Sequence, residues 1–369
     1  MSISPRKEIQ SIEASQHGGP NWAELSYLGL DPEGIIDFSV CTNPFPHPSE
    51  TIQILSATGL NRYPDPEVTE LREHLSLKLG VNSDCILVGN GATELIRLIA
   101  LTYFEPGDPV LIIGPTFGEY EVACQIAGAN VREQRAGAED SFSPKLDEII
   151  RRILEYHPKG IFICNPNNPT GQYLSRHDVE AIVDTAVDSL VILDEAYVSF
   201  VDGAWSSIDL LNRENVIILR SMTKDYALAG LRLGYILADR EIVGNLHKVC
   251  PPWNVNVVAQ KAGVIVLEDD GYLDDSKKLV IEAKQFLEDE LRLLGFTLIP
   301  SRTNFFMVRV VNATKFRSAL LRHSILVRDC SSFGLPEYVR IAPREMVDCH
   351  KLITVIRSLI ERGELEANI

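Results

Sequence analysis

The sequence predicts an α/β fold with two parts: a three-layer αβα large domain around a mostly parallel sheet, and a smaller α+β domain. One observation is a series of short runs that are apolar throughout, which read CILVGN, VLIIGP, GIFICNP, LVILDEAY, VIILRS and GYILAD. The other is that amphipathic stretches such as TELIRLIALTYF and HDVEAIVDTAVDS lie between them. Strands that are buried on both faces and alternate with helices are typical of a parallel sheet covered on both sides.

Three regions follow one another along the 369 residues. Residues 1–60 are expected to form an irregular N-terminal arm that joins the small domain, because turn signals stand at HGGP (17–20) and NPFP (43–46). Residues 61–245 are expected to form the large domain, which opens with the helical pattern EVTELREHLSLKL. Residues 246–369 hold a long charged helix, SKKLVIEAKQFLEDELRLLG, that connects to a small C-terminal domain.

Composition excludes several classes of protein. The formal net charge of -16 repels phosphate backbones and anionic lipids, so we expect no nucleic acid and no membrane as partners. No apolar run approaches the roughly 18 residues of a membrane span, and the first residues lack the apolar core of a signal peptide, so a cytoplasmic location is expected. The 7 cysteines are scattered without a CxxC pair, which predicts reduced thiols and no metal site.

Polar clusters stand at the predicted carboxyl ends of the strands: GNGATE at 89–94, GPTFGEY at 114–120, NPNNPTG at 165–171, DEAY at 194–197 and SMTK at 221–224. Ligands of open parallel sheets bind at these ends, so the clusters predict one shared site. GNGATE also opens a helix, where glycines allow close approach and free N–H groups favour an anion. Taken alone, this motif is equally compatible with a turn that has no ligand.

Two charged residues of this set need a reason for their positions. Asp194 comes directly after four apolar residues, where a carboxylate is costly without a partner; an isolated aspartate there would cap a helix or pair with a basic group. Lys224 follows the strand VIILRS, and Ser221 and Arg232 stand close to it in sequence. Together with the other motifs, this hydroxyl, amine and guanidinium form the set that a phosphorylated aldehyde cofactor requires.

NPNNPTG, DEAY and SMTKDYALAGLRLGY, in this order and spacing, resemble the fold-type I pyridoxal-phosphate enzymes of the class I/II aminotransferases. The resemblance runs from about residue 17 to the C-terminus and is strongest to the branch of histidinol-phosphate aminotransferase and threonine-phosphate decarboxylase. It implies that Lys224 holds pyridoxal 5'-phosphate as a Schiff base and moves the proton at the substrate α-carbon. It also implies that Asp194 keeps the ring nitrogen protonated, so that the ring withdraws electrons.

The resemblance implies further cofactor contacts. Tyr197 and Asn168 would hydrogen-bond the ring oxygen, and Phe117 would stack on the ring face, where many relatives have tyrosine. The residues that would cradle the phosphate are Gly91, Ala92, Thr93, Ser221 and Arg232. Tyr63, in NRYPDP, matches a tyrosine that reaches the cofactor phosphate of the neighbouring subunit, which implies a homodimer with active sites at the interface. A turn tyrosine beside Pro64 is the alternative.

Four residues are candidates for substrate binding by the same resemblance. Arg340, in EYVRIAP, matches the arginine that grips the substrate carboxylate, a task suited to the guanidinium fork. Arg328, in ILVRD, matches a second substrate arginine, with a surface pair to Asp329 as the alternative. His17 would contact a substrate phosphate unless it belongs to a plain N-terminal turn, and Asn43 completes the set.

The reaction stays open between two chemistries. LAG at 228–230 is similar to aminotransferases, so we expect an amino group to move between an amino acid or a histidinol-phosphate-like amine and a 2-oxo acid. HGG at 17–19, IIDFSVCTNP at 35–44 and the threonine of SMTK resemble the decarboxylase branch, which makes threonine-phosphate decarboxylase the alternative. A non-catalytic regulatory module is a third interpretation, which the absence of a preceding helix-turn-helix disfavours.

Overall fold

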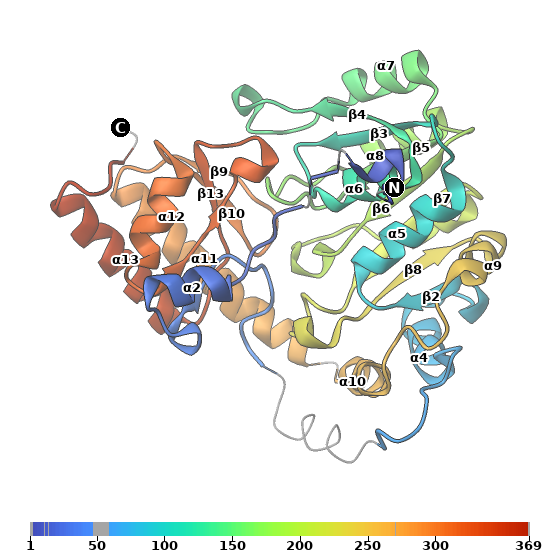
Figure 1. The fold of residues 1–369 in the computed structure, drawn as a ribbon, viewed down its shortest axis with the longest axis horizontal. Helices are drawn as coiled ribbons and strands as arrows, with labels where there is room; N and C mark the ends of the chain where they lie inside the picture. Colours follow the sequence, from blue (N-terminus) through green and yellow to red (C-terminus); the bar gives the residue numbers. More distant parts are fainter. Residues whose placement is uncertain (1–2, 11, 14, 47–58, 270, 368–369) are drawn as a thin grey trace.

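The computed structural model describes residues 3–10, 12–13, 15–46, 59–269 and 271–367. It shows two bodies of secondary structure, a large one drawn from cyan to yellow and a small one in orange and red that the blue N-terminal arm joins (Figure 1). The expected α/β class, with a three-layer large domain and a smaller α+β domain, is confirmed. No helix in the described ranges combines the length and the apolar character that crossing a bilayer requires.

A seven-stranded sheet forms the centre of the large domain. Its order is β2 (Ile86–Gly89), β8 (Gly234–Ala238), β7 (Val216–Ser221), β6 (Leu190–Asp194), β5 (Gly160–Cys164), β3 (Pro109–Gly114) and β4 (Asn130–Arg135). The pairs from β7 to β4 are parallel, and β8 runs antiparallel to both of its neighbours. The mostly parallel arrangement brings the carboxyl ends of β3, β5, β6 and β7 to one edge, which is where ligands bind in such sheets.

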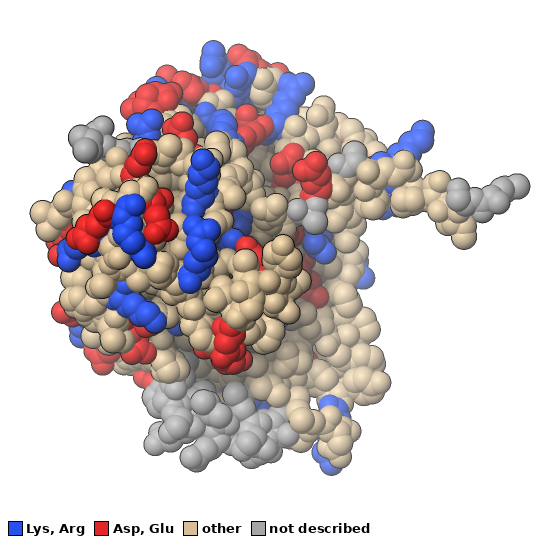
Figure 2. Space-filling model, turned by 60° about the vertical axis from the view of Figure 1, so that its left-hand side comes forward, with Lys and Arg blue, Asp and Glu red and all other residues tan. Residues whose placement is uncertain are grey.

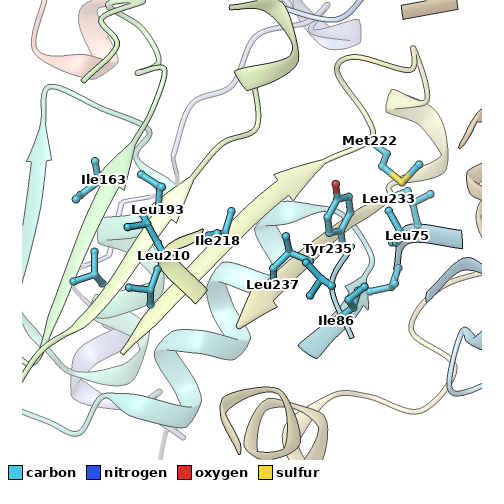
Figure 3. Packing of buried hydrophobic residues seen from close by; sticks show 14 of the residues in the cluster. Leu75, Ile86, Ile163, Leu193, Leu210, Ile218, Met222, Leu233, Tyr235 and Leu237 are labelled. Carbon is cyan, nitrogen blue, oxygen red and sulfur yellow. The ribbon is translucent and has the colours of Figure 1, made fainter. Parts of the chain in front are cut away.

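Helices cover both faces of this sheet because side chains alternate along its apolar strands. One core contains residues of α4 (Thr69–Leu79), α7 (Leu146–Tyr156), α8 (Arg176–Thr185) and α10 (Val257–Glu268). The opposite core contains residues of α5 (Ala92–Tyr103), α6 (Glu119–Ala127) and α9 (Arg240–Val249). Ile163, Leu193 and Ile218 are register partners on three adjacent strands and pack in the first core (Figure 3).

The core of the large domain extends past the predicted boundary at residue 245. Helix α10 packs on α4, and its residues Ala259, Ala262 and Val266 are fully buried in the first core. The chain leaves for the small domain only along α11 (Tyr272–Leu293), whose Leu287 and Leu291 enter a separate core there. The change of sequence pattern near 245 therefore marks the end of the strands rather than the end of the domain.

The small domain is an antiparallel sheet covered by helices. Its strand order is β12 (Arg328–Asp329), β13 (Tyr338–Ile341), β10 (Phe306–Arg309) and β9 (Leu298–Ile299), and its helices are α11, α12 (Ala313–Leu321) and α13 (Met346–Glu361). The arm is less irregular than expected: it contains α1 (Lys7–Gln10), α2 (Trp22–Leu28) and β1 (Ile36–Asp37), which pairs in parallel with β11 (Ile325–Leu326). This pairing joins the arm to the small domain, as the sequence predicts.

Charged side chains of both signs are mixed on the surface of this domain. On the face that Figure 2 shows, Lys and Arg side chains stand among Asp and Glu side chains and form no continuous basic patch. Such a face lacks the concentrated positive charge with which proteins hold a phosphate backbone.

Candidate active site

A cavity of about 510 Å³ lies at the carboxyl ends of the large sheet. Phe117, Asn168, Tyr197 and Lys224 follow β3, β5, β6 and β7 respectively, and all four line it. The remaining walls come from the start of α5, from the N-terminal arm and from the small domain: Thr93, Arg232, His17, Ser39, Cys41, Arg328, Ser332, Phe333 and Arg340. The polar clusters that the sequence places at strand ends thus meet at one site.

The surroundings of the Lys224 amine favour its neutral, nucleophilic form. Burial lowers the pKa of Lys224, and the positive charges of Arg340 and Arg232 lower it further. The nearby Asp194 carboxylate acts in the opposite direction. Because only a neutral amine attacks a carbonyl carbon, an amine with a lowered pKa at the floor of a cavity is suited to join an aldehyde.

Asp194 ends β6 as a buried carboxylate with two donors. Its Oδ1 accepts the Ala196 N–H at 2.9 Å, and its Oδ2 accepts the Tyr120 hydroxyl at 2.6 Å. Burial raises the pKa of Asp194 to about 6, although both hydrogen bonds and the charge of Lys224 favour the ionised form. A cation placed against this carboxylate would lower its pKa again, so the site favours a ligand with a positive charge here.

Tyr120 is the residue of the site that the sequence analysis did not identify. Its ring stacks on Phe162 with centroids 5.0 Å apart and meets the Phe117 ring edge-on at 5.6 Å. It therefore connects an aromatic ring on the cavity wall to the Asp194 carboxylate. Its position three residues after Phe117, at the start of α6, is the signal by which it could have been found.

An anion cradle lies where β2 gives way to α5. Gly91 has a φ of 80°, and a Cβ built on it would meet the Arg232 Nη2 atom at 2.7 Å. The glycine thus lets the guanidinium lie against the backbone at the start of α5, where Ala92 and Thr93 begin the helix and present free N–H groups. This arrangement can bind an anion, and the contact with a cofactor phosphate stays a prediction.

Ser221 is not part of this cradle. Its hydroxyl lies 2.6 Å from the Thr223 hydroxyl, and it lines a separate cavity of about 130 Å³ together with Glu195 and Arg220. The predicted contact between Ser221 and a cofactor phosphate has no support in this geometry. Ser221 is the last residue of β7 and lines this smaller cavity, whereas Lys224 lines the larger one.

Arg328 and Arg340 stand directly opposite each other on β12 and β13, and both are buried. The Arg340 Nη1 donates to the Asn168 Oδ1, and its Nη2 donates to the Ser39 carbonyl at 2.7 Å. Its Nε has no hydrogen-bond partner among the described residues. A buried N–H of this kind is costly to leave unpaired, so it marks a place for an incoming acceptor.

Arg328 has neutral acceptors as well. It donates to the Gln16 carbonyl at 2.6 Å, the His17 carbonyl at 3.0 Å and the Ser332 hydroxyl at 2.7 Å. Burial and the facing Arg340 lower the pKa of Arg328. The alternative of a surface pair with Asp329 is wrong, because Asp329 accepts Thr314 and Ser331 instead. Among the described residues neither of the two buried guanidinium groups forms an ion pair with a carboxylate, which favours an anionic ligand.

Two other candidates, His17 and Asn43, contact polar groups of the chain itself. His17 lines the cavity, but its Nε2 lies 3.0 Å from the buried Glu119 carboxylate, which the sequence analysis did not consider. Asn43 lies outside the cavity lining, and its amide donates to the Asp225 carbonyl and to the Ser276 hydroxyl. Direct substrate contact by Asn43 therefore lacks support within this chain, whereas substrate contact by His17 stays a prediction.

Tyr63 lies on the surface away from this cavity. Its side chain is 78% exposed and stacks on Trp253 with ring centroids 4.3 Å apart. A tyrosine in this position contacts no residue of its own cavity, so any role at a cofactor requires a second chain.

Comparison with known proteins agrees with this geometry. The family model described as aminotransferase class I and II matches residues 33–356. The chain belongs to this family. The aminotransferase is similar to histidinol-phosphate aminotransferase of Thermoanaerobacter sp. (strain X514), with 35% identity over 86% of this chain and 91% of that protein.

Two solved structures share the fold of the aminotransferase. One is histidinol-phosphate aminotransferase from Sinorhizobium meliloti in complex with pyridoxal-5'-phosphate, with a TM-score of 0.87, 23% identity and coverage of 97% and 99% of the two chains. The other is L-threonine-O-3-phosphate decarboxylase from Porphyromonas gingivalis, with a TM-score of 0.75, 27% identity and coverage of 88% and 99%. The chain is thus a pyridoxal-phosphate-dependent aminotransferase of the transferase class.

The residues present fit this cofactor. The cavity offers a buried amine at Lys224 and an anion cradle formed by Arg232 over Gly91, and the Asp194 carboxylate, which could pair with a protonated ring nitrogen, is close enough to Lys224 for their charges to interact. The aromatic ring of Phe117 stands on the cavity wall and contacts the Tyr120 ring. These four features supply a partner for each charged or reactive part of a phosphorylated pyridine aldehyde.

Proposed function

We propose that this aminotransferase transfers the amino group of a phosphorylated amine, of the histidinol-phosphate type, to a 2-oxo acid. The observation that supports this most is the pair of facing guanidinium groups, Arg328 and Arg340, in the cavity that also holds Lys224. Two buried cations are suited to the doubly charged phosphate of such an amine, and three curated relatives named histidinol-phosphate aminotransferase share 33–37% identity with the chain.

The residues divide the work as follows. Bound pyridoxal phosphate supplies an aldehyde and an electron-withdrawing ring. With the cofactor bound, Lys224 Nζ would accept the proton from the substrate α-carbon and return it, and burial lowers the pKa of this amine, which favours its basic form. Asp194 would hold the proton on the ring nitrogen, Tyr197 and Asn168 would donate to the ring oxygen, and Arg232 with the α5 N-terminus would neutralise the phosphate.

Tyr120 is expected to keep Asp194 ionised. Its hydroxyl donates to the carboxylate at 2.6 Å, and this hydrogen bond lowers an aspartate pKa that burial raises to about 6. In Tyr120→Phe the pKa of Asp194 therefore rises further. Because ionised Asp194 is present above its pKa and lost as the pH falls, the acid limb of the kcat/KM profile should move to higher pH. An acid limb at the wild-type position would contradict this role.

Loss of Arg328 is expected to affect phosphorylated substrates more than substrates without a phosphate. Arg328→Ala should lower kcat/KM for histidinol phosphate roughly 10- to 10²-fold, the cost of losing a charge-assisted hydrogen bond. The same variant should use histidinol, which lacks the phosphate, almost as well as the wild type does. The measurement is the ratio of the two kcat/KM values. Equal losses for both substrates would remove Arg328 from recognition of the phosphate.

One experiment tests the proposed reaction as a whole. The protein is incubated with histidinol phosphate and 2-oxoglutarate, and separately with O-phosphothreonine. Glutamate formed in the first mixture supports the proposal, whereas carbon dioxide released in the second would replace it by decarboxylation, which the likeness to the Porphyromonas gingivalis decarboxylase keeps in view.

We also propose that the enzyme is a homodimer in which Tyr63 serves the cofactor phosphate of the neighbouring subunit. The support is that Tyr63 is held by Trp253 in a fixed, exposed position outside its own cavity. A cytoplasmic location stays a prediction.

A further inference from the structure

We propose that Asn43 is a positioning residue for Lys224, acting through the backbone of the segment that carries the lysine. The proposal rests on the proposed function, because it assumes that Lys224 is the amine that reacts. It assigns to Asn43 a role different from the substrate contact that the sequence suggests.

Asn43 holds two consecutive peptide carbonyls. Its backbone N–H donates to the Lys224 carbonyl at 2.7 Å, and its side-chain amide donates to the Asp225 carbonyl at 3.0 Å. The same amide nitrogen donates to the Ser276 hydroxyl at 2.7 Å, and the Oδ1 accepts the Phe45 N–H at 3.1 Å. Both amide hydrogens and the amide oxygen are thus used, which also fixes the orientation of the side chain.

The hydrogen bonds of Asn43 to Lys224, Asp225 and Ser276, which we call the brace, are buried and join three parts of the molecule. Asn43 is only 3% exposed, and Ser276 lies in the first turns of α11, the helix that leads from the large domain to the small one. In Figure 1 the blue arm runs alongside this end of α11 before it reaches the large domain. Asn43 therefore connects the arm, the lysine segment and α11 at one point.

The side chain of Asp225, the residue after Lys224, is held by hydrogen bonds as well. The Asp225 carboxylate accepts the Ser199 hydroxyl at 2.7 Å and its own neighbour's N–H, from Tyr226, at 3.0 Å. Residues 224 and 225 are thus held by Asn43 through their carbonyls and by Ser199 through the Asp225 side chain. Positions of reacting atoms must be kept within about 1 Å, because a larger displacement costs on the order of 10²-fold in rate.

Asn43→Asp tests the brace with the smallest change in shape. The aspartate keeps an oxygen for the Phe45 N–H but replaces the donating amide by an acceptor that faces the Asp225 carbonyl and the Ser276 hydroxyl. With histidinol phosphate and 2-oxoglutarate as the probe, kcat should fall on the order of 10²-fold while KM changes little. The circular dichroism of the lysine-bound cofactor in the visible range should fall as well, because the ring is held less firmly.

Tyr272→Phe is the matched control. The Tyr272 hydroxyl donates to the Phe45 carbonyl at 2.6 Å, so the variant removes a bond between the same arm and the same helix while it keeps the ring that stacks on Tyr226 and all hydrogen bonds of Asn43. Its kcat and visible circular dichroism should stay near wild type. Losses as large as those of Asn43→Asp would show that loosening the arm alone is responsible, and would overturn the proposal.

Ser276→Ala keeps the inference testable if Asn43→Asp fails to fold. It removes the hydroxyl that helps to orient the amide and leaves the bond to Asp225 in place, so a smaller loss of kcat in the same direction is expected at an unchanged melting temperature. Wild-type kcat and dichroism in Ser276→Ala, or in a folded Asn43→Asp, would overturn the brace while leaving the proposed function intact. Wild-type protein that binds cofactor but releases no glutamate would instead overturn the proposed function.

Discussion

Lys224→Ala is expected to abolish transamination and the yellow colour of the lysine-bound cofactor. The variant removes both the amine that joins the aldehyde and the base that moves the α-carbon proton, so kcat/KM should fall on the order of 10⁴-fold or more. The cradle of Arg232 and the α5 N-terminus is untouched, so the cofactor should still bind without a covalent bond. Absorption spectra and steady-state kinetics measure the two effects separately.

Lys261→Ala is a suitable control for the loss of a lysine. Lys261 lies on α10 in an exposed ion pair with Glu70, away from the cavity, and pairs of this kind contribute little to stability. The control should be yellow and fully active. A colourless Lys261 variant, or an active Lys224→Ala enzyme, would mean that another lysine holds the cofactor.

Asp194→Asn has the second-largest expected effect. Asparagine can accept the Ala196 N–H with its oxygen and donate its amide N–H to the Tyr120 hydroxyl oxygen, so the fold should persist. It carries no charge, however, and cannot keep a ring nitrogen protonated. We expect kcat to fall on the order of 10²- to 10³-fold, the scale of removing one electrostatic contact to a developing charge.

The position of Tyr120 makes this prediction sharper. Tyr120→Phe removes a hydrogen bond to the Asp194 carboxylate without removing the charge of the carboxylate. The kcat of Tyr120→Phe at high pH should therefore lie between those of the wild type and Asp194→Asn. Melting temperatures of the three proteins show whether the fold is kept. Near-normal kcat in Asp194→Asn would exclude the carboxylate as the partner of the ring nitrogen.

The fold could be predicted wherever burial leaves its mark on single segments. The apolar runs correspond to β2, β3, β5, β6, β7 and β8, because each is buried on both faces. Strand β4 escaped because it is a polar edge strand, NVREQR, whose pattern shows no buried face. The boundary at 245 was placed too early because packing of α10 on α4 is a tertiary contact that no local pattern reveals.

The site shows the same division. Lys224, Tyr197, Asn168 and Arg340 were recognisable because each follows a strand end or lies in a characteristic motif, and the structure brings them to one cavity. Asn43 and Ser221 also lie in characteristic motifs, yet their side chains form hydrogen bonds with other partners. Which partner a side chain reaches depends on φ, ψ and rotamer rather than on residue type. Tyr120 stands in the cluster GPTFGEY, but only the structure shows its contact with Asp194.

Reduction of the cofactor-bound enzyme with borohydride, followed by digestion and mass spectrometry, tests the central claim most directly. Borohydride makes the bond between the cofactor and its lysine permanent, so the modified peptide identifies the residue. The account predicts a single pyridoxyl group on the peptide that contains Lys224. A pyridoxyl group on any other lysine, with the Lys224 peptide unmodified, would contradict it.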